Sequence, residues 1–330
     1  MKTENQVFAA CLGAAVLALS GCASMQVKLG AKVYLANIAV TSMEAKLPKG
    51  PGIAPGEKSP LVVSLTDQNG KVWQTEGAGS GKIMWSELTV TATVVKFNGK
   101  GVVSLPRDPR LSDGKLPHVT ITAPSHPELR AELDIPVRYD GKYALDFSGS
   151  SGTSGTNGTD GMNGMSGSSG SMDVNNPSAG GAGSNGGDGT DGGDGGAGGD
   201  APAVEIRVAV RAGSHPLLQI GVSAAGRERF FLVDPATGSL TVKADGGTGG
   251  PGGKGGRGGH GGSGGIGLPN GLDGLSGNNG RDGSNGPAGK GGLITVTYDG
   301  QAKGFLGAIK VSSWNGPRPV FQDGTVPALW

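Results

Sequence analysis

The chain divides into two halves that differ in the spacing of their hydrophobic residues. Between residues 26 and 147, apolar and polar residues alternate in short segments separated by Gly, Pro, Asn and Asp. None of these segments keeps the period of about 3.6 residues that an amphipathic helix requires. Alternation over short segments with frequent turn residues is typical of β-sandwiches. We therefore expect an all-β protein without significant helix outside the N-terminal 21 residues, and a β-sandwich over residues 32–147.

Three turn dipeptides lie between alternating segments of this domain and predict three β-hairpins. They are Asn69-Gly70, Asn98-Gly99 and Asp140-Gly141. Further strands are expected at 32–40 and 118–123. The stretch PGEKSPLVVSLTDQNGK resembles bacterial immunoglobulin-like modules, and this resemblance implies an immunoglobulin-like sandwich. Pro136 lies inside a predicted strand, which indicates an edge or a bulge because proline has no N–H to donate.

From residue 149 the pattern changes to glycine at every third position. Four runs keep this frame: run 1 (149–170), run 2 (180–199), run 3 (247–265) and run 4 (271–292). With a β insert at 203–245, predicted to contain a hairpin across 235–238, and C-terminal strands within 293–314, they form a module over 148–330. A left-handed extended helix has three residues per turn and rises about 3.1 Å per residue, so each run would span about 60–65 Å.

Such a helix has no internal hydrogen bonds, and its N–H and C=O groups must therefore bond to a neighbouring chain or to water. Equal run lengths predict an antiparallel bundle of polyglycine-II or polyproline-II-like helices with a small β-sheet cap. The runs resemble the polyglycine-II bundles of springtail antifreeze proteins and of some bacteriophage tail-tip adhesins. Two alternatives stay open, namely a disordered Gly/Ser linker and a trimeric collagen-like assembly.

Runs 2 and 3 carry two glycines in most triplets, and this predicts that they lie inside the bundle. Their bare sides would let neighbouring backbones approach closely. The expected packing glycines are Gly186, Gly189, Gly192 and Gly195 in run 2, and Gly253, Gly256, Gly259 and Gly262 in run 3.

Charged residues also repeat every third position on these two runs. Asp188, Asp191 and Asp194 form a stripe on run 2, and Lys254 and Arg257 form one on run 3. One hypothesis is that these opposite charges pair and set the register of the bundle. The alternative is that both stripes are solvated edges that keep the bundle soluble, since exposed ion pairs contribute only about 0–1 kcal/mol.

Two further patterns in the runs indicate alternative ligands. The segments GGDGTD and GGAGGD resemble the start of the calcium-binding RTX nonapeptide and would make Asp191 and Asp200 calcium ligands. The core-filling eighth place of that repeat does not match, so we expect no cofactor and keep calcium as the alternative. Thr153, Thr156 and Thr159 form a short ladder, as on ice-binding faces.

The N-terminus has the layout of a signal peptide, a cation followed by a short apolar segment. It ends in LSGC at positions 19–22, which resembles the lipobox of bacterial lipoproteins. The resemblance implies cleavage between Gly21 and Cys22, a signal peptide over 1–21, diacylglycerol on Cys22 and a tether over 22–31. Ala23 favours the outer membrane. Cys11 leaves with the signal peptide, so no disulfide is expected in the mature chain.

Composition narrows the function further. A net charge of +1 gives no strong electrostatic attraction for the phosphates of nucleic acid. The four histidines are scattered, and no catalytic constellation stands out, so we expect no enzyme. Lipobox and glycine triplets together resemble the glycine-rich, collagen-like lipoproteins of environmental proteobacteria, a likeness that names no activity. We expect a membrane-anchored envelope protein with a structural, display or adhesive role. Its partners would be polysaccharide, matrix or another envelope protein, met at loops 171–179 and 266–270.

Overall fold

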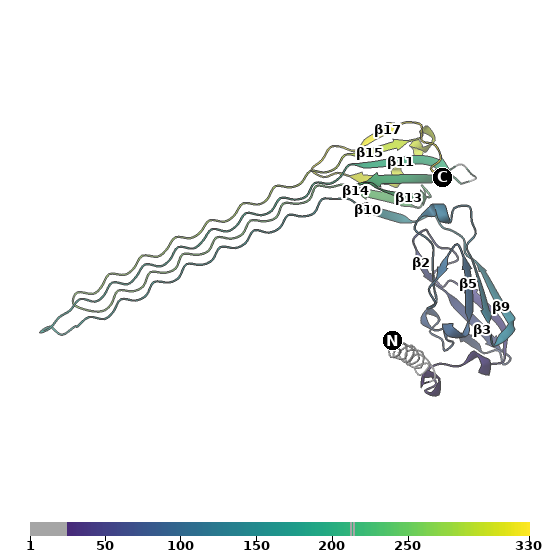
Figure 1. The fold of residues 1–330 in the computed structure, drawn as a ribbon, viewed down its shortest axis with the longest axis horizontal. Coiled ribbons are helices and arrows are strands. Elements are labelled where there is room, and N and C mark those ends of the chain that lie inside the picture. The colour runs from purple at the N-terminus through teal and green to yellow at the C-terminus, as the bar shows by residue number, and fades with distance from the viewer. Residues whose placement is uncertain (1–24, 212, 214) are drawn as a thin grey trace, which may run out of the picture.

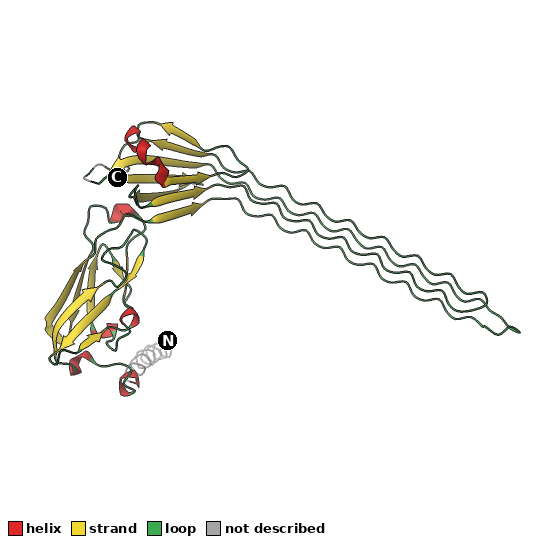
Figure 2. Cartoon of the chain, turned by 180° about the vertical axis from the view of Figure 1, so that it is seen from behind, coloured by secondary structure: helices red, strands yellow, loops and turns green. Residues whose placement is uncertain are grey.

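The structure is a computed structural model that describes residues 25–330 except 212 and 214, so Gly21 and Cys22 lie outside the described residues. The described chain is all-β, as predicted, and its named helical elements are short 3₁₀ turns (Figure 2). The longest of these turns is η5 (Gly300–Ala308), with nine residues. Within residues 25–330, apart from the two exceptions, no helix is long and apolar enough to cross a membrane.

The N-terminal domain contains three three-stranded sheets around one hydrophobic core. The sheets have the strand orders β1-β3-β4, β5-β8-β9 and β2-β7-β6. The strands are β1 (Val40–Lys46), β2 (Lys58–Pro60), β3 (Val62–Asp67), β4 (Val72–Gln74), β5 (Thr89–Thr93), β6 (Lys96–Phe97), β7 (Val102–Ser104), β8 (His118–Ala123) and β9 (His126–Asp134). The 3₁₀ turns are η1 (Leu35–Asn37), η2 (Gly77–Gly79), η3 (Trp85–Glu87) and η4 (Pro109–Leu111). Leu65, Ile83 and Ile121 are fully buried at its centre.

Two of the three predicted hairpins are present. β3 and β4 pair across Asn69-Gly70, and β6 and β7 pair across Asn98-Gly99. Both glycines have positive φ, +78° at Gly70 and +74° at Gly99, which a residue with a side chain adopts only at a cost. The strand expected at 118–123 is β8.

The strand expected at 32–40 is wrong, because this segment contains the turn η1 and β1 begins only at Val40. The N–H of Leu35 donates to the Glu87 carboxylate at 3.1 Å, a side-chain partner that cannot be read from local alternation.

The third hairpin, at Asp140-Gly141, is wrong as well. β10 (Lys142–Asp146) pairs in parallel with β14 (Ser239–Lys243), so it belongs to the C-terminal module and not to a domain ending at residue 147. Pro136 has no N–H, and its C=O accepts from Ile53 on the N-terminal domain at 3.0 Å. The C=O of Tyr139 then accepts from Asp234 at 2.8 Å, which carries the chain across to the other module.

The C-terminal module has two sheets that share a second core, more than the small cap we expected. One sheet has the order β13-β12-β11-β15-β17 and the other β10-β14-β16. The remaining strands are β11 (Val204–Arg211), β12 (Leu217–Ala224), β13 (Arg227–Val233), β15 (Ile294–Tyr298), β16 (Ile309–Ser312) and β17 (Val320–Asp323). Ile206 and Ile220 from the first sheet pack in one buried cluster with Leu240 from the second. β13 and β14 lie in different sheets, so the hairpin predicted across 235–238 is wrong.

The four glycine runs extend from one end of these two sheets as a long rod, directed away from the N-terminal domain (Figure 1). Each run continues a strand of the C-terminal module. Run 1 follows β10, run 2 leads into β11, run 3 follows β14 and run 4 leads into β15. The rod is therefore the continuation of four core strands, and we use the term rod for runs 1–4 together.

Candidate functional site

The runs of the rod are held together by backbone hydrogen bonds within one chain. Run 1 bonds to runs 2 and 3, and run 4 bonds to runs 2 and 3, whereas runs 2 and 3 also bond to each other. Runs 2 and 3 thus have three neighbours each, the inner position expected from their double glycines. Representative N–H to C=O bonds are Gly158 to Lys254 (2.7 Å), Gly187 to Met162 (2.8 Å), Gly186 to Leu275 (2.9 Å), Gly253 to Gly193 (2.9 Å) and Gly283 to Gly253 (2.8 Å).

The bundle is only partly antiparallel, which corrects our expectation. Consecutive runs are antiparallel, but run 1 is parallel to run 3 and run 2 is parallel to run 4. The reason lies in the sheets at the base, where β10 pairs in parallel with β14 and β11 in parallel with β15. Each parallel strand pair simply continues outward as a parallel pair of runs.

The register of the strand pairs also continues from the sheets into the rod. Lys142 of β10 pairs with Ser239 of β14, and further out Asn157 of run 1 contacts Lys254 of run 3 at the same sequence separation of 97. Run 2 and run 4 keep the separation of 90 that β11 and β15 have at the base. Strand pairing in the folded base therefore fixes the register of the rod.

Glycine is required where two runs approach each other most closely. At the eight predicted packing glycines, an added Cβ would lie closer than 3.0 Å to a neighbouring carbonyl oxygen. Gly186, Gly189, Gly192 and Gly195 would meet run 3, and Gly253, Gly256, Gly259 and Gly262 would meet run 1. The second glycine of each run 3 triplet is also buried, as at Gly253 and Gly256. Two β-sheets with side chains between them pack about 10 Å apart. The glycine runs have no side chains at these contacts, so their backbones come close enough to form hydrogen bonds with each other.

Asparagine and aspartate at the third place of runs 1, 2 and 4 cap backbone N–H groups of a neighbouring run. In run 1, Asn157, Asp160 and Asn163 accept from residues of run 3 at 2.7–2.9 Å. In run 2, the acceptors are Asn185, Asp188, Asp191, Asp194 and Asp200, and all five accept from run 4. In run 4, the acceptors are Asp273, Asn279, Asp282 and Asn285, all toward run 3. The signal that predicts these caps is the triplet Gly-x-Asx, which our sequence reasoning missed.

Run 3 has no asparagine or aspartate at its third places. Its own N–H groups are instead capped by side chains of runs 1 and 4. In one of its triplets, the N–H of Gly252 donates to Asn285 of run 4, that of Gly253 to the Gly193 carbonyl of run 2, and that of Lys254 to Asn157 of run 1. All three donors of the triplet are therefore satisfied by three different neighbours. Double glycines therefore mark the two runs that are bonded to three neighbours, run 2 and run 3.

The hypothesis that opposite charges of runs 2 and 3 pair and set the register is wrong. The carboxylates of Asp188, Asp191 and Asp194 accept from backbone N–H groups of run 4, at 2.6–2.7 Å. The N–H of Arg257 is capped by Asp160 of run 1. Lys254 pairs with Asp282 of run 4 at 2.6 Å, an exposed pair that holds the pKa of Asp282 below its usual value, chiefly through the Lys254 hydrogen bond. The carboxylates of the rod bind mainly to backbone N–H groups. Each of these caps satisfies an N–H group that has no carbonyl acceptor within the bundle.

The residues of the alternative ligand sites are also engaged in the bundle. Asp191 and Asp200, the candidate calcium ligands, each cap a run 4 N–H three triplets apart. Among residues 25–330 as described, no group of three or more His, Cys, Asp or Glu side chains gathers around one point. Thr159 of the threonine ladder hydrogen-bonds across to Thr190 of run 2 at 3.1 Å, while Thr153 and Thr156 lie beside glycines of run 2.

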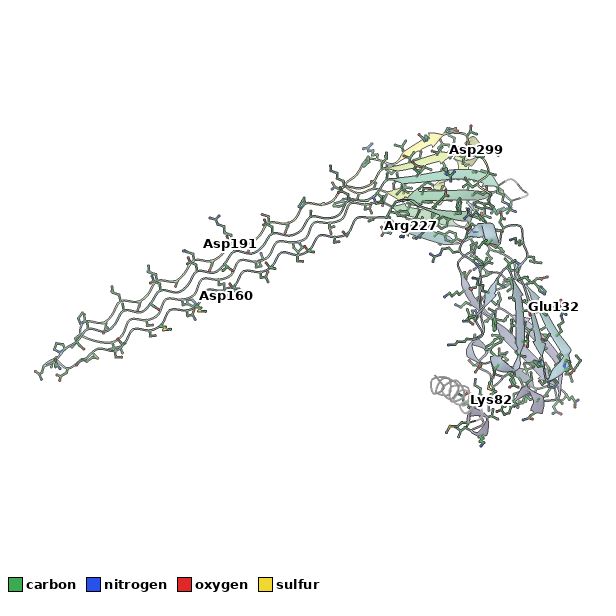
Figure 3. The ribbon with its side chains drawn as sticks, in the orientation of Figure 1. Lys82, Glu132, Asp160, Asp191, Arg227 and Asp299 are labelled. Atoms are coloured by element: carbon green, nitrogen blue, oxygen red, sulfur yellow. The ribbon has the colours of Figure 1, made fainter. Side chains whose placement is uncertain are left out.

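Loops 171–179 and 266–270 connect the runs at the far end of the rod (Figures 1 and 3). Exposed apolar side chains gather in this distal half. They are Met162, Met165, Met172, Val174, Ile266, Leu268, Leu272 and Leu275, exposed by 42% to 86%. In the corresponding second places of their triplets, the proximal parts of runs 1 and 4 carry serine, threonine, asparagine, arginine, lysine and one proline, Pro287. The far end is thus the region of the rod that is chemically equipped for an apolar contact.

Comparison with protein-family models, with curated proteins and with solved structures finds no match to this chain.

Proposed function

We propose that this protein is a bacterial outer-membrane lipoprotein whose polyglycine-II rod holds an apolar contact surface away from the membrane. Its role is structural, display or adhesive, without catalysis. The observation that carries the proposal is the gathering of exposed apolar side chains at one end of a rigid rod, far from the N-terminal domain. Loops and surfaces held on rigid scaffolds commonly carry recognition.

The fold classes of the two modules belong to the same proposal. Backbone hydrogen bonds between glycine-triplet runs support the polyglycine-II class for the rod. Antiparallel short sheets around one core support an immunoglobulin-like sandwich for the N-terminal domain. Because the rod's hydrogen bonds lie within one chain, the proposal needs no collagen-like trimer.

The lipid anchor is tested by following palmitate incorporation in cells that express the full chain. We expect labelled wild-type protein in the outer-membrane fraction, because two or three acyl chains give stable anchoring. Cys22→Ala should lose the label and leave the membrane, while Cys11→Ala should keep both. Unchanged labelling of Cys22→Ala would refute the anchor and leave the rod unaffected.

The adhesive role is tested by replacing the distal loops. Cells displaying the wild-type protein should bind immobilised polysaccharide or extracellular matrix more than cells with 171–179 and 266–270 replaced by Gly-Ser loops of equal length. Equal binding by both would refute adhesion through the loops and favour a purely structural role.

A further inference from the structure

Four of the exposed apolar side chains lie on the shaft of the rod and not in its end loops. Met162 and Met165 belong to run 1 and are 86% and 81% exposed, and Leu272 and Leu275 belong to run 4 and are 80% and 73% exposed. Large apolar side chains grouped on an exposed surface in this way usually mark an interaction site. We call these four residues the distal patch.

All four residues flank the same stretch of run 2. Their carbonyl groups accept hydrogen bonds from four N–H groups of that run, at 2.8–2.9 Å. Gly187 and Ser184 donate to Met162 and Met165, and Gly183 and Gly186 donate to Leu272 and Leu275. The two apolar pairs therefore lie on either side of residues 183–187, at one level of the rod.

This stretch carries no charge. Run 2 has Ser184 and Asn185 here, and its aspartates begin at Asp188. The nearest aspartate of run 4, Asp273, caps the N–H of Gly264 on run 3. A surface that contacts a copy of itself must avoid like charges, and the distal patch meets this condition whereas the proximal stretch does not.

The shape of the distal patch decides between occupants. Successive members of each pair repeat every three residues, about 9 Å along the rod, so the patch runs along the shaft. A lipid bilayer met end-on would cover the loops and leave most of the shaft exposed. A sugar would favour aromatic side chains, and runs 1–4 contain no Phe, Tyr or Trp. A second copy of this rod repeats its side chains with the same period, so its side chains can meet those of the distal patch at every triplet.

We propose that the distal patch binds the distal patch of a second copy of this chain, so that two rods lie side by side as a symmetric dimer. This inference requires only the rod as described and not the anchoring or adhesion proposed above. The methionine pair and the leucine pair of one rod would pack against the apolar pairs of the other, on either side of run 2.

Photo-crosslinking in the full-length protein tests the dimer. p-Benzoylphenylalanine replaces Met165 in one variant and Thr156, the same place three triplets nearer the base, in the control. We expect a covalent dimer from position 165, joined to peptides within 160–187 or 271–280, at least fivefold above the yield from position 156. Adducts only to lipid or to another protein, equal yields from both positions, or no adduct at position 165 would overturn the proposal.

A second experiment places the photo-crosslinker outside the distal patch, so that the patch itself can be substituted. With the photo-crosslinker at Ser168, the change Met162→Thr, Met165→Thr, Leu272→Asn and Leu275→Asn should reduce dimer yield at least fivefold. Thr159 and Asn278 already occupy the equivalent places of runs 1 and 4, so these side chains suit the rod. The control Leu111→Asn with Leu116→Asn removes apolar side chains that are 54% and 57% exposed on the N-terminal domain, and should leave the yield unchanged. Equal losses in both variants would refute a specific patch.

Discussion

At the scale of single residues, the rod depends on glycines that have no room for a side chain. At Gly256, an added Cβ would overlap the carbonyl oxygen of Thr159, and the residue is buried between runs. Backbone atoms fixed by hydrogen bonds on several sides cannot move away as the end of a flexible side chain can. The requirement therefore comes from close approach and not from an unusual φ, since Gly256 is not among the residues with positive φ.

We predict that Gly256→Ala destabilises the rod by about 1–3 kcal/mol, the usual range for overpacking. Differential scanning calorimetry of the full chain would measure the loss. Gly304→Ala is the matched control, because an added Cβ there meets nothing within 4 Å. That substitution should leave stability unchanged or raise it by several tenths of a kcal/mol, through the lower entropy of the unfolded chain. Similar effects of the two changes would contradict the packing role.

The capping carboxylates allow a second test at the residue scale. Asp191→Ala removes the acceptor for the N–H of Arg281, and we expect a loss of about 0.5–1.5 kcal/mol. Asp191→Asn keeps an oxygen in the same place, as Asn157 and Asn279 do in runs 1 and 4, and should cost much less. Hydrogen exchange at Arg281, compared across the two variants, measures the cap directly. Faster exchange in both alike would show that charge, not the acceptor, is what matters.

At the scale of elements, the charges of the rod add pH dependence but do not set its register. The pKa of Asp282 is lowered by Lys254, and the pKa of Lys254 is raised by Asp282. A carboxyl whose folded pKa lies below its unfolded value of about 3.9 stabilises the fold above that pH. Its contribution is lost as pH falls through the folded pKa.

We therefore predict that the melting temperature of the rod falls in acid and that Asp282→Asn weakens this fall. The amide keeps the cap on the Gly255 N–H and removes only the charge. Lys254→Gln should weaken the acid dependence by a similar amount, and the double variant should add little, because both changes remove the same pair. Melting curves between pH 2 and pH 7 measure the effect. Fully additive changes would mean that the two groups act separately.

Register provides the sharper prediction for the runs as elements. Because the strand pairs of the base fix the sequence separations of 97 and 90, all four runs must have matching lengths. Deleting one triplet from each run at the same level should give a folded rod about 9 Å shorter. The triplets are 158–160, 189–191, 255–257 and 280–282. Deleting 158–160 alone should misplace the caps of run 1 beyond that point and destabilise the distal half. Small-angle scattering measures the length, and an equally well folded single deletion would contradict inherited register.

The amino-acid sequence predicts some of these elements well and others poorly, for physical reasons. Local signals such as Asn69-Gly70 identify their hairpins because two adjacent residues determine the geometry of the turn. The run boundaries and the inner position of runs 2 and 3 follow from glycine spacing alone. β10 could not be placed, because its partner β14 lies 97 residues away and local alternation does not name partners. The caps were missed because their effect appears only once a neighbouring run supplies the N–H.

At the scale of the whole molecule, the rod can hold its distal patch in a defined place only if the two modules are fixed to each other. Trp330 packs edge-on against Phe230 of β13, with ring centroids 5.9 Å apart. Its indole N–H donates to Asp113 of the N-terminal domain at 2.9 Å. Arg110 of η4 also lies over the Phe230 ring, with its guanidinium carbon 3.8 Å from the ring centroid. The C-terminal segment thus ties the β13 edge of the rod's base to the N-terminal domain.

We predict that Trp330→Ala loosens this junction without unfolding either core. Trp330 is half-buried, so the loss should be about 1–2 kcal/mol, below the 3–5 kcal/mol typical of fully buried tryptophan. In small-angle scattering the maximum dimension should spread over a wider range, because the rod would sample many angles to the N-terminal domain. Trp314→Ala is the control, since that side chain is 55% exposed near the base of the rod. If Trp330→Ala leaves the scattering curve unchanged, the other contacts of the junction fix the angle without Trp330, among them the Asp234 N–H to Tyr139 C=O bond and Arg110 over the Phe230 ring.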